Sequence, residues 1–289
     1  ADRAIPRIMF EFNLKTKLIL GTGEALNVGK YAEEIGFKRI ALIVDPGVFN
    51  TDYVKELIEN IKAQHFDFIK IRKYDLQGEP DYDSLDRVKL EFIDANKKPI
   101  TDCFIAIGGG SVIDFSKGLA TLMTNQDPAI CYRGFPVNIN PSLPVIALPT
   151  TAGTASEVTY NAVFISLKDK KKLGINTMNN FPILAILDPK LTLNCPKQII
   201  VSSGMDALTH SLESYVAVQA NILTRIFAKE AFGLTYNSLW TILDNLDDLK
   251  IRENLQLGAY LAGISLMNSG SGPAGALSYP LGVHFRIHH

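Results

Sequence analysis

Several features that would mark a special class of protein are scarce or missing in this 289-residue chain. Its three cysteines, Cys103, Cys131 and Cys195, are odd in number and far apart, which argues against a disulfide framework and a zinc-type cysteine pair. Its 29 lysines and arginines balance 30 aspartates and glutamates, so its charge gives no reason to expect nucleic acid or an anionic membrane as a partner. Apolar runs stay below the roughly 18 residues of a membrane helix, and the first residues hold no apolar signal core. We therefore expect a cytoplasmic protein without a membrane span.

What remains is the composition of a globular protein with a large core. Hydrophobic residues make up 47% of the chain and charged residues 20%, which is ordinary for a globular domain. The length allows one large domain or two moderate ones.

The most informative stretch is a strand, a glycine turn and a helix at residues 103–122. Residues 103–107 carry no charge and predict a buried strand, and an amphipathic helix opens at Ser111 after Gly108, Gly109 and Gly110. Glycines let the backbone approach a ligand, and the unpaired N–H groups of a first helical turn bind anions. The segment therefore fits a phosphate site, but it also fits an ordinary strand-to-helix turn, because its spacing is not the Gly-x-Gly-x-x-Gly fingerprint.

Strand and helix patterns alternate through the first half of the chain. Strands are expected at about 9–20, 40–44, 66–74, 103–107 and 144–149, with helices at about 24–36, 51–64, 84–95 and 111–122. This alternation predicts a parallel, doubly wound sheet whose binding groups lie at the carboxyl ends of the strands. Asp45, Gly108–Ser111 and Thr150–Thr154 each follow a strand, so the three turns meet at one edge. That convergence predicts a nucleotide-type crevice.

The second half changes in character after Pro196. Residues 160–188 predict a hairpin excursion that returns on a strand at 183–187, with a basic turn at Lys168 and Lys170–Lys172 for which a solvated role is ordinary. Beyond this point only helices are expected, at about 203–219, 222–240 and 253–268. We therefore expect an α/β domain over 1–195 and a helical domain over 196–289.

Asp206 and His210 form a candidate metal pair in the helical half. The residues 202–213 are expected to begin a capped helix, and a spacing of four places both side chains on one face. A carboxylate and an imidazole so placed can share a divalent metal, or they can simply hydrogen bond to each other. A third ligand would be needed, and His284, His288 and His289 cluster near the end of the chain, although terminal histidines can also be tag remnants.

With these residues in hand, the chain resembles the iron-containing, or group III metal-dependent, alcohol dehydrogenase family. Three motifs in the family's order carry the resemblance: Gly108-Gly109-Gly110-Ser111-x-x-Asp114-x-x-Lys117, Pro149-Thr150-Thr151-Ala152-Gly153-Thr154-x-Ser156-Glu157, and Gly204-Met205-Asp206-Ala207-Leu208-x-His210-x-x-Glu213. The resemblance implies a dinucleotide-binding α/β domain with a parallel sheet, an all-helical C-terminal domain as in dehydroquinate synthase-like architectures, and a metal in the cleft between them. It also implies a small alcohol or aldehyde as substrate and a homodimer or larger homo-oligomer.

The resemblance assigns roles residue by residue. Gly109, Gly110 and Ser111 would hold the pyrophosphate, Asp114 would lie near the nicotinamide, Thr150, Thr151 and Thr154 would line the cleft, and Lys172 would approach the nicotinamide ribose. Asp45 matches the acidic residue that accepts from ribose hydroxyls and repels a 2′-phosphate, so NAD is favoured over NADP. Asp206 and His210 would be the first two metal ligands.

The chain departs from the family pattern near its end. Gly275 stands where the family commonly has a metal-binding histidine, and Tyr279 stands where it often has a catalytically linked one. The remaining metal histidine falls on His289, which argues against a tag remnant there, so the expected ligands are Asp206, His210 and His289. Family members usually carry further helices beyond this point, and the helical domain is therefore expected to be incomplete.

These residues predict an NAD-linked alcohol dehydrogenase or aldehyde reductase that uses iron or zinc, because Asp and His ligands suit both metals. Tyr279 or a metal-bound water would replace the usual histidine in proton transfer. A non-catalytic nucleotide-binding relative with a degraded metal site is the alternative that Gly275 and Tyr279 motivate. A sugar-phosphate cyclase of the dehydroquinate synthase type shares the fold, but it normally has Val after the three glycines where this chain has Ser111.

Overall fold

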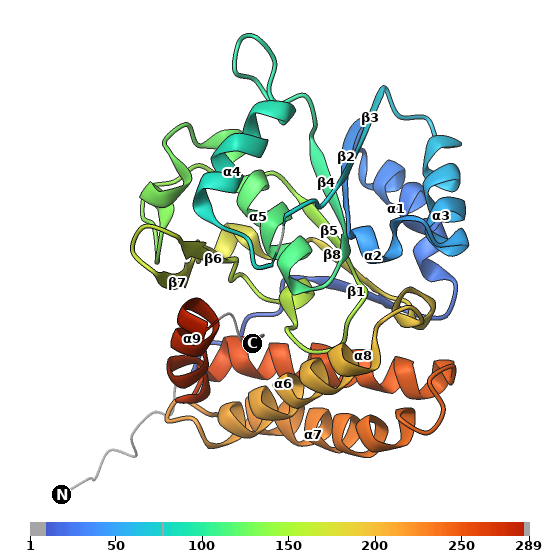
Figure 1. Cartoon of the computed structure of the whole chain (residues 1–289), viewed down its shortest axis with the longest axis vertical. Coiled ribbons are helices and arrows are strands. Elements are labelled where there is room, and N and C mark those ends of the chain that lie inside the picture. Colours follow the sequence, from blue (N-terminus) through green and yellow to red (C-terminus); the bar gives the residue numbers. More distant parts are fainter. Residues whose placement is uncertain (1–9, 77, 286–289) are drawn as a thin grey trace, which may run out of the picture.

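The computed structural model describes residues 10–76 and 78–285, which form a parallel sheet between two helical layers with a block of helices below it (Figure 1). The strands are β1 (Lys17–Leu20), β2 (Arg39–Val44), β3 (Phe68–Lys73), β4 (Cys103–Gly108), β5 (Val145–Pro149), β6 (Val163–Ser166), β7 (Lys171–Gly174) and β8 (Leu184–Leu187). The α-helices are α1 (Val28–Ile35), α2 (Pro46–Phe49), α3 (Asp52–Lys62), α4 (Tyr82–Lys89), α5 (Gly110–Thr124), α6 (Lys197–Val216), α7 (Ile222–Ile242), α8 (Leu249–Ser269) and α9 (Ala274–Phe285).

The six-stranded sheet is parallel and doubly wound, as the alternation of strands and helices predicts. Its order is β1-β8-β5-β4-β2-β3, and each neighbouring pair is parallel. Alternate residues of β4 face opposite layers: Phe104 packs in the core beneath α4 and α5, and Ile105 packs in the core beneath α1 and α3. The strand pattern and the two covered faces confirm the expected fold class.

The order of the strands predicts where a ligand crevice lies. The chain runs outward from β2 to β3, returns to place β4 on the other side of β2, and then continues to β5 and β8. Ligands bind in such sheets at the carboxyl ends of the strands where the order reverses. Asp45 follows β2 and the glycine turn follows β4, so both residues flank this position.

The expected hairpin is present as a separate two-stranded sheet. Strands β6 and β7 pair antiparallel, from Val163 opposite Gly174 to Ser166 opposite Lys171. The basic turn is shorter than expected, because Lys171 and Lys172 already belong to β7. The chain then returns through β8, as predicted.

The helical part differs from the expectation at both of its ends. Helix α6 begins at Lys197, directly after Pro196, and not at about 203. The expected cap at Ser202 and Ser203 is wrong, since these serines lie inside α6, where the Ser203 hydroxyl donates to the carbonyl oxygen of Ile199 at 2.7 Å. Helix α9 was not expected at all.

The two parts pack directly against each other. Tyr260 and Ile264 of α8 pack on Ala185 and Leu187 of β8, while Ile200, Leu208, Leu239 and Leu255 form a core within the helical part.

Among residues 10–76 and 78–285, every helix is too short or too polar to cross a membrane.

Candidate active site

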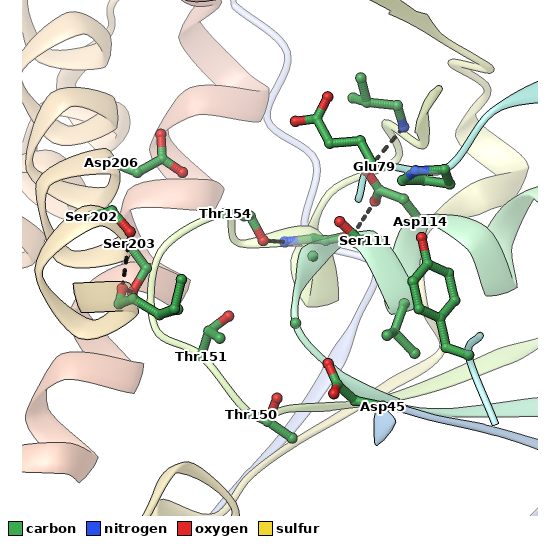
Figure 2. A pocket seen from close by; sticks show the side chains of 18 of the residues that line it. Asp45, Glu79, Ser111, Asp114, Thr150, Thr151, Thr154, Ser202, Ser203 and Asp206 are labelled. Carbon is green, nitrogen blue, oxygen red and sulfur yellow. Dashed lines mark hydrogen bonds between the residues drawn. The ribbon is translucent and has the colours of Figure 1, made fainter. Parts of the chain in front are cut away.

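A cleft of about 530 Å³ lies between the carboxyl edge of the sheet and helices α6, α8 and α9. Its volume is within the range of pockets that enclose small ligands and cofactors. It brings together every site residue predicted within the described part of the chain: Asp45, Gly109, Gly110, Ser111, Asp114, Thr150, Thr151, Thr154, Lys172, Asp206, His210 and Tyr279. Figure 2 shows Asp206 facing Ser111 and Asp114 from the opposite wall.

The glycine turn is built for close backbone approach. A Cβ atom on Gly110 would lie 2.6 Å from Thr154 Oγ1, and one on Gly108 would lie 2.6 Å from the Val112 side chain. Gly109 precedes the first residue of α5, and no side chain caps the helix. The first turn of α5 is therefore open to an anion, which is the arrangement that holds a phosphate.

The loop after β5 joins the glycine turn to the helical part. The backbone N–H of Thr150 donates to the carbonyl oxygen of Gly108 at 3.1 Å. A Cβ atom on Gly153 would lie 2.5 Å from the carbonyl oxygen of Ser203, so the loop touches the α6 backbone. Thr150, Thr151 and Thr154 thus form the floor between the two walls (Figure 2).

Asp45 lies at the other side of the glycine turn. Its backbone N–H donates to the carbonyl oxygen of Ile107 at 2.8 Å, and its Oδ1 accepts from the N–H of Gly47 at 2.7 Å, which caps α2. The carboxylate is therefore held at the end of β2 beside β4. This is the position from which a carboxylate reaches a ribose.

Asp114 lines the cleft but also holds the neighbouring segment in place. Its Oδ2 accepts from the N–H of Val163 at 2.9 Å, and its Oδ1 accepts from the Ser156 hydroxyl. Burial raises the pKa of Asp114, while the charge of Lys117 at 3.6 Å opposes that shift. The buried Lys117 belongs to the first motif, but its contacts with residues 156–161 could not be read from the sequence.

Lys172 meets two partners in the cleft. Its ammonium pairs with the carboxylate of Glu79 and lies 4.8 Å from the centre of the Tyr279 ring. Burial, followed by the nearby carboxylates, raises the pKa of Tyr279 to about 12, so its phenol is neutral at physiological pH. No sequence pattern marks Glu79, because it lies in a loop with no motif and meets Lys172 only in the folded chain.

Asp206 and His210 occupy one face of α6, as the spacing predicts, and they point into the cleft. The His210 Nε2 and Asp206 Oδ1 atoms are 3.4 Å apart. The Nδ1 atom of His210 is buried and has no hydrogen-bond partner within residues 10–76 and 78–285. An imidazole nitrogen and a carboxylate oxygen so close together fit one divalent metal.

The third predicted ligand, His289, lies outside the described residues. Within the described ones no group of three or more His, Cys, Asp or Glu side chains converges on a metal position. His284 is exposed at the end of α9. The described residues thus supply two ligands of the expected set.

Glu213, the last residue of the α6 motif, contacts the start of α9, and the sequence does not predict this contact. Its Oε1 accepts from the N–H of Ala274 at 2.7 Å, the first residue of α9. A Cβ atom on Gly272 would lie 2.6 Å from the same oxygen, so the chain passes close to this carboxylate. Glu213 therefore fixes the start of the helix that carries Gly275 and Tyr279.

Fold and cleft together define a class: α/β proteins with a ligand cleft between the carboxyl edge of a parallel sheet and a helical part. Residues 15–189 match the family "Iron-containing alcohol dehydrogenase" and residues 200–289 match "Fe-containing alcohol dehydrogenase family, C-terminal". The chain belongs to the iron-containing alcohol dehydrogenase family, whose members act on CH–OH donors.

Individual relatives are similar over nearly the whole chain. Alcohol dehydrogenase 4 of Schizosaccharomyces pombe is 33% identical over 100% of this chain and 67% of its own length. The NAD-dependent methanol dehydrogenase of Bacillus methanolicus is 31% identical over 97% of this chain and 72% of its own length. The chain therefore spans about two thirds to three quarters of these relatives.

Solved structures of enzymes share the fold. A 1,3-propanediol oxidoreductase superposes with a TM-score of 0.88 at 28% identity, covering 97% of this chain and 72% of that one. A sulfoacetaldehyde reductase from Bifidobacterium kashiwanohense, solved in complex with NAD+, gives a TM-score of 0.88 at 26% identity, covering 97% of this chain and 73% of that one.

Proposed function

We propose that this protein interconverts an alcohol and an aldehyde or ketone by hydride transfer to or from NAD, assisted by a divalent metal. One observation carries the proposal: a single cleft joins the open first turn of α5 to the Asp206–His210 pair of α6. A site for an anionic dinucleotide and a site for a metal thus face the same space, where a small substrate can meet both.

The dinucleotide fits the sheet side of the cleft. Gly109, Gly110 and Ser111 would hold the pyrophosphate at the N-terminus of α5, with the threonines of the 150–154 loop beside it. Asp45 would accept from ribose hydroxyls and repel a 2′-phosphate, which favours NAD over NADP. The NAD-dependent name of one relative and the NAD+ complex of another structure support this choice.

The metal fits the helical side. Asp206 and His210 would bind it, with His289 as the third ligand, and the family name favours iron over zinc although both accept these ligands. When bound, a divalent metal polarises the substrate oxygen as a Lewis acid, and NAD accepts or supplies the hydride.

The chain's own residues would orient the reactants and move a proton. Tyr279 holds a neutral hydroxyl in the cleft, and its ring is placed by the Lys172 ammonium, which Glu79 holds in turn. Its Oη would exchange a proton with the substrate oxygen in place of the histidine that is common in the family. The Leu266 and Met267 side chains would face the carbon chain of a small substrate.

The direct experiment is NAD-linked turnover of short alcohols by the purified protein supplied with ferrous or zinc ions. We expect Asp206→Ala to lower kcat/KM by at least about a hundredfold, because it removes a metal ligand. The matched control is Asp244→Ala, which removes an exposed carboxylate from the turn after α7. Turnover that persists after both Asp206→Ala and chelation would exclude the metal role.

A second candidate is a nucleotide-binding protein without catalysis. It is favoured by Gly275, which supplies no side chain to the metal site at a position where a ligand is common in the family. NADH binding without a stoichiometric metal would support this candidate, and metal at one equivalent per chain would exclude it.

Three further assignments are proposals on the sequence alone. We propose a boundary between an α/β domain and a helical domain near residue 196, a homodimer or larger homo-oligomer, and a cytoplasmic location. Limited proteolysis near 196, light scattering and cell fractionation test them in that order.

A further inference from the structure

We propose that Lys117 is a positioning residue that shapes the half of the cleft for the nicotinamide. This proposal rests on the proposed binding of NAD and assigns a task to a side chain that touches neither cofactor nor substrate. Lys117 lies in α5, its side chain is 0% exposed, and it stands behind the wall of the cleft.

The N–H donors of the Lys117 ammonium all bond to one segment, residues 156–161. Its Nζ donates to Ser156 Oγ at 2.9 Å, to the carbonyl oxygen of Thr159 at 2.9 Å and to the carbonyl oxygen of Asn161 at 2.8 Å. An ammonium has three N–H groups, so each one is used. The Asp114 carboxylate lies 3.6 Å from the same atom and supplies the opposite charge.

These bonds join two walls that are far apart in the sequence. The three acceptors belong to residues 39 to 44 positions after Lys117. Asp114 adds a second set of ties to the same segment, through the Ser156 hydroxyl and the N–H of Val163. Removing Lys117 would leave two backbone carbonyls and the partly buried Asp114 carboxylate without their cation.

The segment that Lys117 holds is part of the cleft surface. Ser156, Thr159, Asn161 and Val163 all line the cleft together with Asp114. Figure 2 shows Asp45 and Asp114 on different sides of Ser111, the residue that follows the glycine turn. A pyrophosphate seated on that turn would direct its adenosine half toward Asp45 and its nicotinamide half toward Asp114 and the held segment.

Stability alone does not explain a lysine at this position. A buried charged pair is often no more stabilising than apolar side chains of the same size, so its presence is weak evidence for a purely structural role. Two of the bonds of Lys117 fix the backbone carbonyls of Thr159 and Asn161, which lie between a 3-10 turn at Ser156–Val158 and β6. The lysine thus holds the irregular stretch between these two short elements in place.

The chain offers a matched control in Lys89. This lysine of α4 is also buried, at 7% exposure, and its Nζ donates to the carbonyl oxygens of Asn125 and Gln126 at 3.1 and 3.4 Å. Neither Lys89 nor its acceptors line the cleft. Both lysines therefore hold backbone carbonyls, and only Lys117 does so behind the cleft wall.

The test compares NADH with ADP-ribose, which lacks the nicotinamide, as titrants of wild type, Lys117→Met and Lys89→Met. We expect Lys117→Met to weaken NADH binding by about tenfold or more and ADP-ribose binding by less than about threefold. We expect Lys89→Met to lower the melting temperature without changing either affinity by more than about twofold. A purely structural role would make the two variants behave alike.

Two results would overturn the proposal: unchanged NADH affinity in folded Lys117→Met, or equal loss of both ligands. If Lys117→Met does not fold, Lys117→Gln is used instead: its shorter, uncharged side chain has two N–H donors and cannot make all of the bonds of Lys117. We expect it to weaken NADH binding more than ADP-ribose binding, and wild-type NADH affinity in that variant would overturn the proposal as well. Wild type that binds neither ligand would contradict the proposed function instead, so the two failures are distinguishable.

Discussion

Gly110 lies in the phosphate turn at a position with no room for a side chain. A Cβ atom added to this glycine would lie 2.6 Å from Oγ1 and 2.7 Å from Cγ2 of Thr154, and Cβ atoms in proteins do not approach other atoms so closely. Any side chain at this position displaces Thr154, which itself faces the cleft. The demand for glycine here comes from a neighbour and not from an unusual backbone angle.

Gly110→Ala is expected to weaken NADH binding by about tenfold or more, because the displaced Thr154 intrudes on the pyrophosphate position. Fluorescence titration with NADH measures this loss. The control is Gly233→Ala within α7, where an added Cβ meets no atom within 4 Å. That variant should keep its NADH affinity and gain up to about 1 kcal/mol of stability, because alanine is the better helix former. Equal affinities in both variants would contradict the crowding at Gly110.

The buried environment of Glu157 makes the stability of the protein depend on pH. Its side chain is 4% exposed, and burial raises its pKa from 4.5 to about 7. The folded protein therefore binds this proton more tightly than the unfolded chain does. The group's contribution to stability is complete below pH 4.5 and is lost as the pH rises through about 7.

Glu157→Gln removes that dependence, since an amide does not titrate. We expect the free energy of unfolding of the variant, minus that of wild type, to increase by up to about 3 kcal/mol between about pH 5 and about pH 8. Urea unfolding at both pH values measures it, with the exposed Glu230→Gln on α7 as the control. A difference that stays constant with pH would show that Glu157 ionises normally.

Residue roles could be predicted only where contacts are local or a motif marks them. The Asp206–His210 pair follows from a spacing of four on a helix, and the structure confirms that the two side chains face each other. The partnership of Lys172 with Glu79 spans 93 positions, and its contact with Tyr279 spans more. No local sequence pattern predicts contacts between residues so far apart in the chain.

At the scale of elements, the strands β2 to β5 and β8 were predicted well, whereas the strand expected at about 9–20 is confined to Lys17–Leu20 and helix ends were predicted poorly. Buried strands such as β4 are short uncharged runs, which few other elements resemble. The start of α6 was misplaced because Ser202 and Ser203 look like caps, whereas the helix begins after Pro196 and the serine hydroxyls bond within it. The sequence does not predict helix α9, because the helix contains Pro280 and two glycines, which usually interrupt helices.

Glu213 makes a charged contact with the start of helix α9. Glu213→Ala removes the acceptor of the Ala274 N–H, so we expect the amides of 274–285 to exchange with solvent about tenfold faster or more. Hydrogen exchange read by mass spectrometry measures this, and α7 should stay at its wild-type rate. The control is Glu230→Ala, which removes an exposed carboxylate. Wild-type exchange across α9 in Glu213→Ala would mean that other contacts anchor the helix.

At the scale of the whole molecule, the cleft results from two independent features. The parallel sheet delivers Asp45, the glycine turn and the threonine loop to one edge, which the strand order predicts. The helical part delivers Asp206, His210 and Tyr279 to the same space, which depends on how α8 packs on β8 through Tyr260 and Ile264. That packing could not be derived from periodicity, because α8 is apolar on nearly all sides.

The most direct test of a shared cofactor and metal cleft is a crystal structure of the protein grown with NAD and ferrous or zinc ions, recorded at the metal's absorption edge. We predict the NAD pyrophosphate at Gly109–Ser111, and an anomalous peak within about 2.5 Å of Asp206 and His210 side-chain atoms. NAD bound at the glycine turn with no anomalous peak at that pair, or with the metal elsewhere, would contradict the account.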